Sequence, residues 1–208
     1  VTLLLSGHAL ANVLDFSATD NADRWLVSTH VGGADGEFAS FNTSDFATAT
    51  SIASRPGWIA NNASGTNGGI GTWTFFVFRQ TFDLSDLDPE SVELLFRWAA
   101  DDSGEVYSYR GSWVPKFRLN DGDLVPWGTG PTYNFGSVVS LTEGFVAGIN
   151  TIDFFVEGNG VTDGFALTVL GATADPLVPG TVPLPATLSL VVVGLTLLSF
   201  KRQRPEKA

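Results

Sequence analysis

Two short acidic stretches carry the side chains best suited to hold a metal ion. The stretch "NDGD" supplies Asn120, Asp121 and Asp123, and "ADDSG" supplies Asp101 and Asp102. Calcium binds carboxylate, amide and backbone oxygens of this kind. Neither stretch has the spacing of an EF-hand loop, and acidic residues also form ordinary solvated turns. Calcium is therefore the candidate cofactor, with plain turn residues as the alternative.

Aromatic side chains between the regular strand patterns form a second candidate site. Carbohydrate sites stack exposed rings on sugar faces and use amides and carboxylates to bind hydroxyl groups. Trp73 and Trp98 lie within strand patterns, so we expect both in the core. The alternative for each remaining ring is that it caps one end of the fold. The candidates, which lie in Gly- and Pro-rich surroundings, are Trp58, Tyr107, Tyr109, Trp113, Trp127 and Tyr133.

The sequence lacks the residues that most catalytic sites need. It has no Cys and two His, and His30 alone cannot build a His-rich zinc site if His8 belongs to an export signal. A G-x-S-x-G nucleophile motif is also missing. Asp101 and Asp102 are adjacent after a predicted strand, so alternation would point them apart, unlike the acid pair of a glycosidase. We predict that the protein is not an enzyme.

Charge restricts the class of partner. Between Asn12 and Gly180 there are 21 Asp and Glu against 7 Lys and Arg, a difference of −14. A surface this acidic repels phosphate backbones, so we expect no nucleic-acid partner. The same charge favours solubility and attracts divalent cations.

Short alternating runs predict an all-β domain. "SVELLFRWAA" and "TIDFFVEG" show the period of two that is typical of half-buried strands. "TWTFFVFRQTF" is aromatic or β-branched almost throughout, as expected for a central strand covered on both faces. The residues expected to share one side of their strands are Val92, Leu94, Phe96 and Trp98, then Ile152, Phe154 and Val156, and then Phe165, Leu167 and Val169.

Turn signals and the two ends of the chain define the domain organisation. D-P, N-D-G and D-G turns separate the strands, which predicts a single jelly-roll-like β-sandwich over residues 12–172. Residues 1–11 end in A-L-A, as in the remnant of a secretory signal peptide. Residues 173–181 form a Pro-rich linker. In residues 182–208 we expect one C-terminal hydrophobic helix, whose apolar run from Leu184 to Phe200 is at the lower limit for spanning a membrane and is followed by basic residues.

The C-terminal 27 residues resemble the PEP-CTERM sorting signal of exopolysaccharide-producing Gram-negative bacteria. Leu184 stands where that family usually has Glu. The resemblance implies an exosortase-like membrane protease as partner and transient anchoring in the inner membrane. The resemblance also implies that the released protein reaches the cell surface or the extracellular matrix. The motif residues are Val182, Pro183, Leu184, Pro185, Ala186, Thr187 and Leu188, and the basic stop comprises Lys201, Arg202 and Arg204.

The preceding domain resembles the galactose-binding-like β-sandwiches that often accompany this signal. The blocks that carry this resemblance most strongly are "RWAADDSG" and "GFVAGINTIDFFVEGNG". A sandwich of this kind does not by itself define a function.

Together these features predict an exported, non-catalytic protein of the cell envelope or extracellular matrix. The alternative is a carbohydrate-binding module that acts on exopolysaccharide, which would make polysaccharide a partner. A glycoside hydrolase is the third possibility.

Overall fold

The computed structural model describes residues 11–31, 45–66, 74–101, 116–126, 134–158 and 162–178. These ranges are almost entirely β, and their helical elements are the 3₁₀ turns η1 (Ala22–Arg24) and η3 (Pro89–Ser91). Within them, no helix has the length and apolar character to cross a bilayer. The strands are β1 (Asn12–Val13), β2 (Leu26–Val31), β3 (Ala47–Thr48), β4 (Thr50–Ser51), β5 (Ile59–Ala60), β6 (Thr74–Asp83), β7 (Glu93–Asp101), β8 (Lys116–Leu119), β9 (Val125–Pro126), β10 (Val139–Leu141), β11 (Ile149–Gly158) and β12 (Gly164–Ala174).

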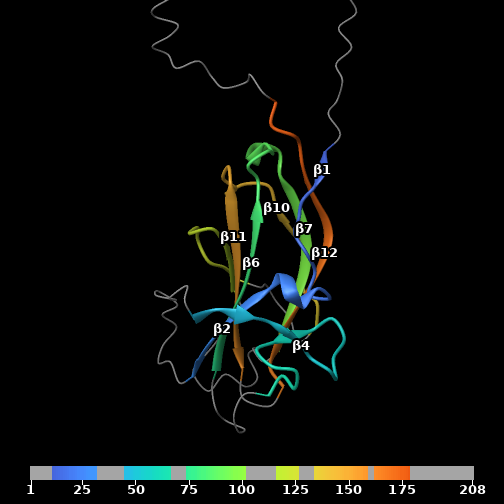
Figure 1. Ribbon diagram of the computed structural model, residues 1–208, viewed down its shortest axis with the longest axis vertical. Helices are drawn as coiled ribbons and strands as arrows, with labels where there is room; N and C mark the ends of the chain where they lie inside the picture. Colours follow the sequence, from blue (N-terminus) through green and yellow to red (C-terminus); the bar gives the residue numbers. More distant parts are fainter. Residues whose placement is uncertain are drawn as a thin grey trace, which may run out of the picture. The chain divides into compact units, whose positions relative to one another are not determined.

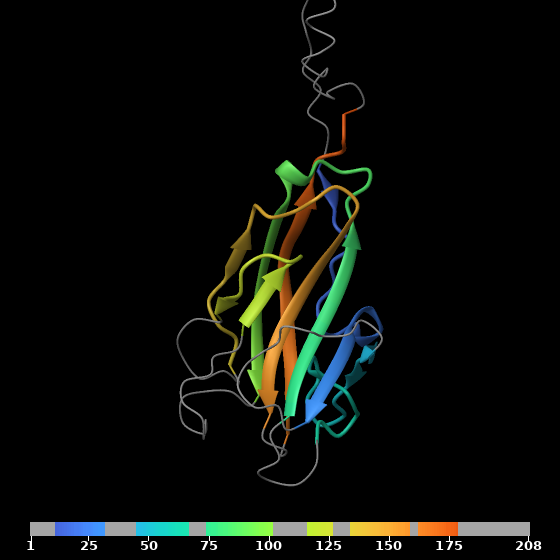
Figure 2. The same cartoon turned by 90° about the vertical axis from the view of Figure 1, so that its left-hand side faces the viewer.

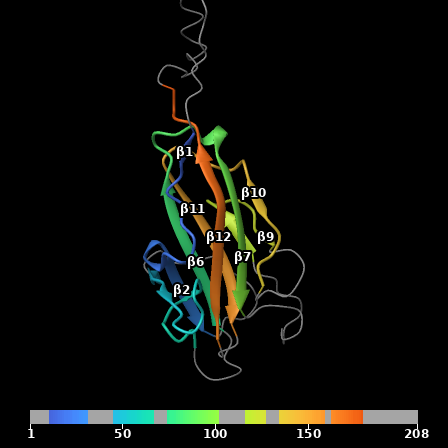
Figure 3. The same cartoon turned by 90° about the vertical axis from the view of Figure 1, so that its right-hand side faces the viewer.

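The strands form two antiparallel sheets (Figure 1). Sheet A has the order β10-β7-β12-β5-β4, and β1 also pairs with β12. Sheet B has the order β3-β2-β6-β11-β8-β9. Figure 2 faces the outer surface of sheet B, whereas Figure 3 faces sheet A. The prediction of an all-β domain is therefore confirmed for the described ranges.

Alternation along β7 places its large apolar side chains in the core. Leu94, Phe96 and Trp98 are buried, while Glu93 and Arg97 are exposed. The same rule applies to β11, where Ile152, Phe154 and Val156 belong to the core cluster. Phe165 and Leu167 of β12 are buried in this cluster, and Val169 packs against it. The shared sides predicted from the period of two are confirmed, and the structure shows that they face the core.

Strand β6 lies inside sheet B, hydrogen-bonded to β2 on one side and to β11 on the other. Phe76 and Phe78 belong to the core cluster, and Val77 on the opposite side of the strand is also fully buried. At these positions side chains on both sides of the strand are buried, which favours apolar residues in succession. This explains why the sequence of β6 does not alternate.

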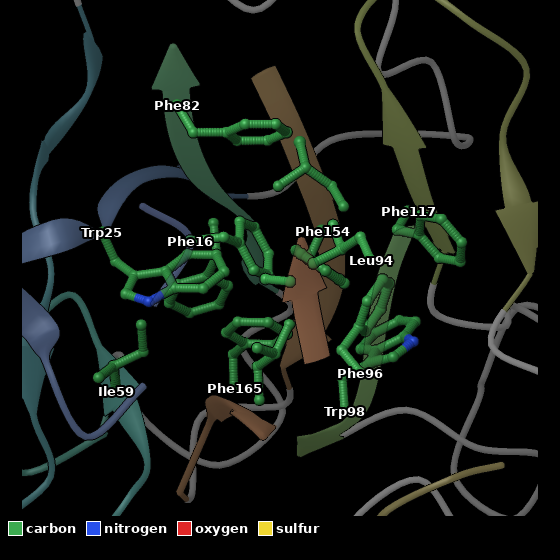
Figure 4. Close-up of a cluster of buried hydrophobic side chains, with 14 of the residues drawn as sticks. Phe16, Trp25, Ile59, Phe82, Leu94, Phe96, Trp98, Phe117, Phe154 and Phe165 are labelled. Carbon is green, nitrogen blue, oxygen red and sulfur yellow. The ribbon is translucent and has the colours of Figure 1, made fainter. Parts of the chain in front are cut away.

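Aromatic rings from both sheets meet in the core (Figure 4). Trp98 of sheet A lies 5.1 Å from Phe154 of sheet B between ring centroids, in an edge-to-face arrangement. Phe165 of sheet A lies 4.7 Å from Phe154 and 5.1 Å from Phe78. Such pairs add to the stabilisation that burial alone provides. Because the sequence has no Cys, this core stabilises the domain without disulfides.

The first and last described strands pair with each other at one end of the fold (Figure 3). Asn12 of β1 is opposite Ala174 of β12. Strand β12 thus extends two residues beyond Ala172, and Pro176 forms an isolated bridge with Leu87. The compact β unit ends at Pro176. The sorting motif and basic stop, residues 182–208, lie outside the described residues, as does the expected signal remnant up to residue 10.

Candidate carbohydrate-binding site

Residues 55–58 form a tight turn between β4 and β5. The backbone N–H of Trp58 donates to the carbonyl of Arg55 (3.0 Å), and Gly57 has a φ of 81°. Pro at the second position and a Gly with positive φ at the third are typical of a type II turn. The turn reverses the chain, so the side chains of its first and fourth residues come together.

Arg55, Trp58 and Asp101 form what we call the end cluster. The guanidinium carbon of Arg55 lies 4.0 Å from the ring centroid of Trp58. Nη1 of Arg55 also donates to Oδ2 of Asp101 at 2.5 Å. Asp101 is the last residue of β7 and is opposite Gly164, the first residue of β12. The end cluster therefore joins the β4–β5 turn to the ends of two long strands of sheet A.

Thr19 fixes this turn to the body of the domain. Its Oγ1 donates to the carbonyl of Gly57 (2.6 Å) and accepts from the backbone N–H of Leu167 in β12 (2.9 Å). The side chain is 1% exposed. Because the Thr19 side chain is buried and bonds both the turn and β12, it holds the turn against the sheet.

The end cluster combines the three groups that proteins use to bind sugars. An indole ring stacks on a sugar face, while guanidinium and carboxylate groups bind hydroxyls. One face of Trp58 is covered by Arg55, and a Cβ placed on Gly164 would lie 3.4 Å from Cε3 at the ring edge. Apart from Nη1, the Arg55 guanidinium makes no hydrogen bond with the described residues. A sugar would therefore meet the guanidinium of Arg55 before it reached that face of the indole.

Trp58 is the one predicted sugar-binding aromatic that the structure places. It is half-buried, consistent with a ring that both packs and remains accessible. Trp98, expected in the core, is buried there. Trp73 and the other five candidates, Tyr107, Tyr109, Trp113, Trp127 and Tyr133, lie outside the described residues.

Asn120 of the predicted calcium turn has a structural role. It adopts a φ of 52°, and its Nδ2 donates to the carbonyl of Gly144 and to Oδ1 of Asn150, both at 3.0 Å. Its Oδ1 accepts from the backbone N–H of Thr151 (2.9 Å). These bonds attach the turn after β8 to the beginning of β11. A calcium ion would have to share this oxygen with an existing hydrogen bond.

The two acidic stretches lie at opposite ends of the two sheets. Asn120 lies beside Thr151, near the beginning of β11. Asp101 is opposite Gly164. The neighbouring Asp163 places its carboxyl group against Gly158, at the end of β11. From residue 151 to residue 158 the strand extends roughly 23 Å. The structure therefore does not bring Asp101 together with Asn120 in one metal site.

Acidic side chains elsewhere in the described ranges do not assemble into a metal centre. No group of three or more His, Cys, Asp or Glu side chains in these ranges could hold an ion. Asp121 and Asp123 are exposed, Asp101 is ion-paired with Arg55, and Asp102 lies outside the described residues.

Sequence reasoning missed Arg55, although the signal was available. The P-G dipeptide at residues 56 and 57 marks a turn. A type II turn brings its first residue close to its fourth, so the predicted site at Trp58 implied Arg55 as a neighbour. The pairing of Arg55 with Asp101 has no such local signal, because 46 residues separate them.

Comparisons with known proteins found two distant similarities in structure. No family model matches the chain, and no curated protein sequence matches it. A beta-glucosidase from Kluyveromyces marxianus is similar with a TM-score of 0.38 and 12% identity, covering 79% of this chain and 17% of that one. The enzymatically active domain of bacteriophage CBA120 tailspike protein 4 is similar with a TM-score of 0.31 and 19% identity, covering 76% and 20%. The chain thus spans about a fifth of the length of each structure, and neither likeness assigns a function.

Proposed function

We propose that this is an exported, non-catalytic protein of the cell envelope or extracellular matrix, sorted by an exosortase-type system. The observation that carries the proposal is the motif from Val182 to Leu188, with the apolar run and basic residues that follow it. On this proposal the β unit is a jelly-roll-like sandwich. One hydrophobic helix in residues 182–208 holds it transiently in the inner membrane, until an exosortase-like protease releases it.

The position of the motif supports this order of events. The compact β unit ends at Pro176, before the motif begins. Cleavage at the motif would therefore remove none of the described strands. Intact-mass measurement of the protein released by its native host tests the proposal. Released protein that still carries residues 184–200 would contradict it.

The surroundings of Asp101 support a non-catalytic role. Its carboxylate faces the guanidinium of Arg55, at 2.5 Å, rather than a second carboxylate. A glycosidase needs two carboxyl groups on either side of the bond to be cleaved. Asp102, the other predicted acidic candidate, follows Asp101 directly and lies outside the described residues.

The end cluster favours carbohydrate binding as a second candidate function. Its indole, guanidinium and carboxylate lie together and are fixed to the domain through Thr19. A glycan array probed with the full chain and with Trp58→Ala tests this. We expect the substitution to abolish binding to the glycans that the native protein retains.

Phe135 provides a matched control for this experiment. It is an exposed aromatic residue that also contacts an arginine, Arg97, at 5.5 Å from the ring centroid. Phe135→Ala should leave glycan binding unchanged. Equal loss of binding in the two variants would show that the end cluster is not the site.

A further inference from the structure

A row of charged residues crosses the outer face of sheet B, the surface that Figure 2 presents. Arg79 of β6 is opposite Asp153 of β11, and Asp153 is opposite Arg118 of β8. Because these positions are in register and alternate with core residues, their side chains all point away from the core. A single carboxylate therefore lies between two guanidinium groups.

The Asp153 carboxylate is 1% exposed and accepts hydrogen bonds from both arginines. Nε and Nη2 of Arg79 lie 2.6 Å from Oδ1 and 2.8 Å from Oδ2, a bidentate arrangement. Hydrogen bonding to Asp153 raises the pKa of Arg79 despite its burial, and the charges of Asp153 and Asp121 add to this effect. The pair of Arg79 and Asp153 thus satisfies both oxygens by itself.

Arg118 is not needed to satisfy the carboxylate of Asp153. Its Nε and Nη2 lie 3.3 and 3.2 Å from Oδ2 of Asp153, an oxygen that already accepts a bond from Arg79. Its guanidinium also lies 5.3 Å from the ring centroid of Phe155. The side chain keeps 24% exposure, and its Nη1 makes no hydrogen bond with the described residues. Arg118 is therefore an ordered cation with an accessible edge.

Lys116 adds a third positive charge to the same face. It precedes Arg118 by two positions in β8 and is opposite Phe155. Within the described ranges it forms no ion pair. Asp121, whose charge also raises the pKa of Arg79, is exposed after the end of β8. The positive charges of Lys116 and Arg118 repel each other, and a bound anion would offset this repulsion.

The clustering is exceptional for this chain. The residues between 12 and 180 carry a formal charge of −14. Yet three of the six Lys and Arg side chains in the described ranges, Arg79, Lys116 and Arg118, gather on one face. The other three are dispersed: Arg24 pairs with Asp15, Arg55 with Asp101, and Arg97 lies over Phe135.

We propose that Arg118 and Lys116 bind the carboxylate of a uronic acid residue in an acidic polysaccharide. The guanidinium edge matches a carboxylate in geometry, and the ammonium group adds a second charge-assisted hydrogen bond. The choice of polysaccharide rests on the proposed function in the envelope or matrix. The strongly acidic remainder of the domain opposes densely charged polyphosphates more than a polymer with one charge per sugar.

Calorimetric titration of the full chain in a non-ionic detergent tests this assignment. The probe is an oligogalacturonate, and the matched probe is its methyl ester, which keeps the sugars and removes the charge. We expect binding of the acid to weaken as salt is raised and the ester to bind at least about tenfold less tightly. Lys116→Gln and Arg118→Gln should each weaken binding of the acid by about tenfold or more.

Arg97→Gln is the control because it removes an exposed positive charge from sheet A. This variant should bind the acid as the native protein does. Lys116→Gln keeps the result interpretable if Arg118→Gln disturbs Asp153. No binding of the acid, equal binding of the ester, or equal loss in Arg97→Gln would overturn the assignment. So would tighter binding of a sulfated oligosaccharide or single-stranded DNA of equal charge.

The outcome is separable from that of the proposed function. Normal processing of the tail without uronate binding would refute the inference about sheet B alone. Uronate binding by a chain whose tail is never processed would leave the site intact and refute the sorting proposal.

Discussion

Arg55 covers one face of Trp58, with the guanidinium carbon 4.0 Å from the ring centroid. The same guanidinium pairs with Asp101, so one side chain connects an aromatic ring in a hairpin turn to the end of a long strand. The sequence selected Trp58 for sugar binding, but the position of its ring depends on Arg55, which the sequence analysis did not select.

A double-mutant cycle measures the strength of the Arg55–Asp101 pair. The side chains are 27% and 19% exposed, so solvent screens the interaction. We expect a coupling free energy of about 0.5–1 kcal/mol from urea unfolding of Arg55→Ala, Asp101→Ala and the double variant. Additive effects of the two single substitutions would show that the pair contributes no stability.

Thr19→Val should destabilise the domain more than loss of the Arg55–Asp101 pair. It removes a buried hydroxyl that bonds Gly57 and Leu167, leaving a carbonyl and an N–H group without that partner. The expected loss in the free energy of unfolding is about 2–3 kcal/mol. Thr19→Ser keeps the hydroxyl and should lose less than half as much. Equal losses would mean that the missing methyl contacts, not the hydrogen bonds, determine the effect.

The tail prediction concerns Leu184, which stands where PEP-CTERM signals usually have Glu. If a protease reads this motif, Leu184→Glu should speed release from the membrane or leave it unchanged. Pulse-chase labelling followed by intact-mass measurement gives the rate, with Leu184→Ala as the control for loss of the side chain. Slower release of Leu184→Glu than of Leu184→Ala would indicate a plain membrane anchor.

Calcium removal should leave the melting temperature of the protein unchanged. Asp101 is engaged by Arg55, and the side-chain oxygen of Asn120 already accepts a hydrogen bond from Thr151. A ligand that binds only the folded state would raise the melting temperature. Calorimetry with calcium and with a chelator checks this. A calcium-dependent rise that Asp121→Asn or Asp123→Asn removes would establish a site at this turn.

Asp83 should contribute to a loss of stability in acid. Its Oδ1 accepts from Oγ of Ser85 (2.6 Å) and from the backbone N–H of Ser85 (2.8 Å), and these bonds lower the pKa of its carboxyl group. A lowered pKa stabilises the fold above the ordinary value for Asp, and this contribution disappears as the pH falls through the folded value. Ser85→Ala should move the pKa of Asp83 back towards the ordinary value, whereas Ser85→Thr should not. Titration of the Asp83 carboxyl carbon by NMR distinguishes these outcomes.

Strand type and core facing could be predicted from the sequence because they are local properties. Leu94, Phe96 and Trp98 alternate with other residues, and an extended backbone turns alternate side chains to opposite faces. The R-P-G-W turn is local in the same sense, since its hydrogen bond joins residues 55 and 58. Local sequence carries both signals, although only the strands were predicted from it.

Strand partners and charge clusters were decided by the tertiary structure. Alternation predicted that Ile152, Phe154 and Val156 share one side of β11, but it did not identify Arg79 and Arg118 as the neighbours of Asp153 on the other side. Any two extended strands can form the same ladder of backbone hydrogen bonds, so the backbone does not select among partners. The choice is made when aromatic side chains such as Trp98, Phe154 and Phe165 fill one shared core, and it sets the register across both sheets.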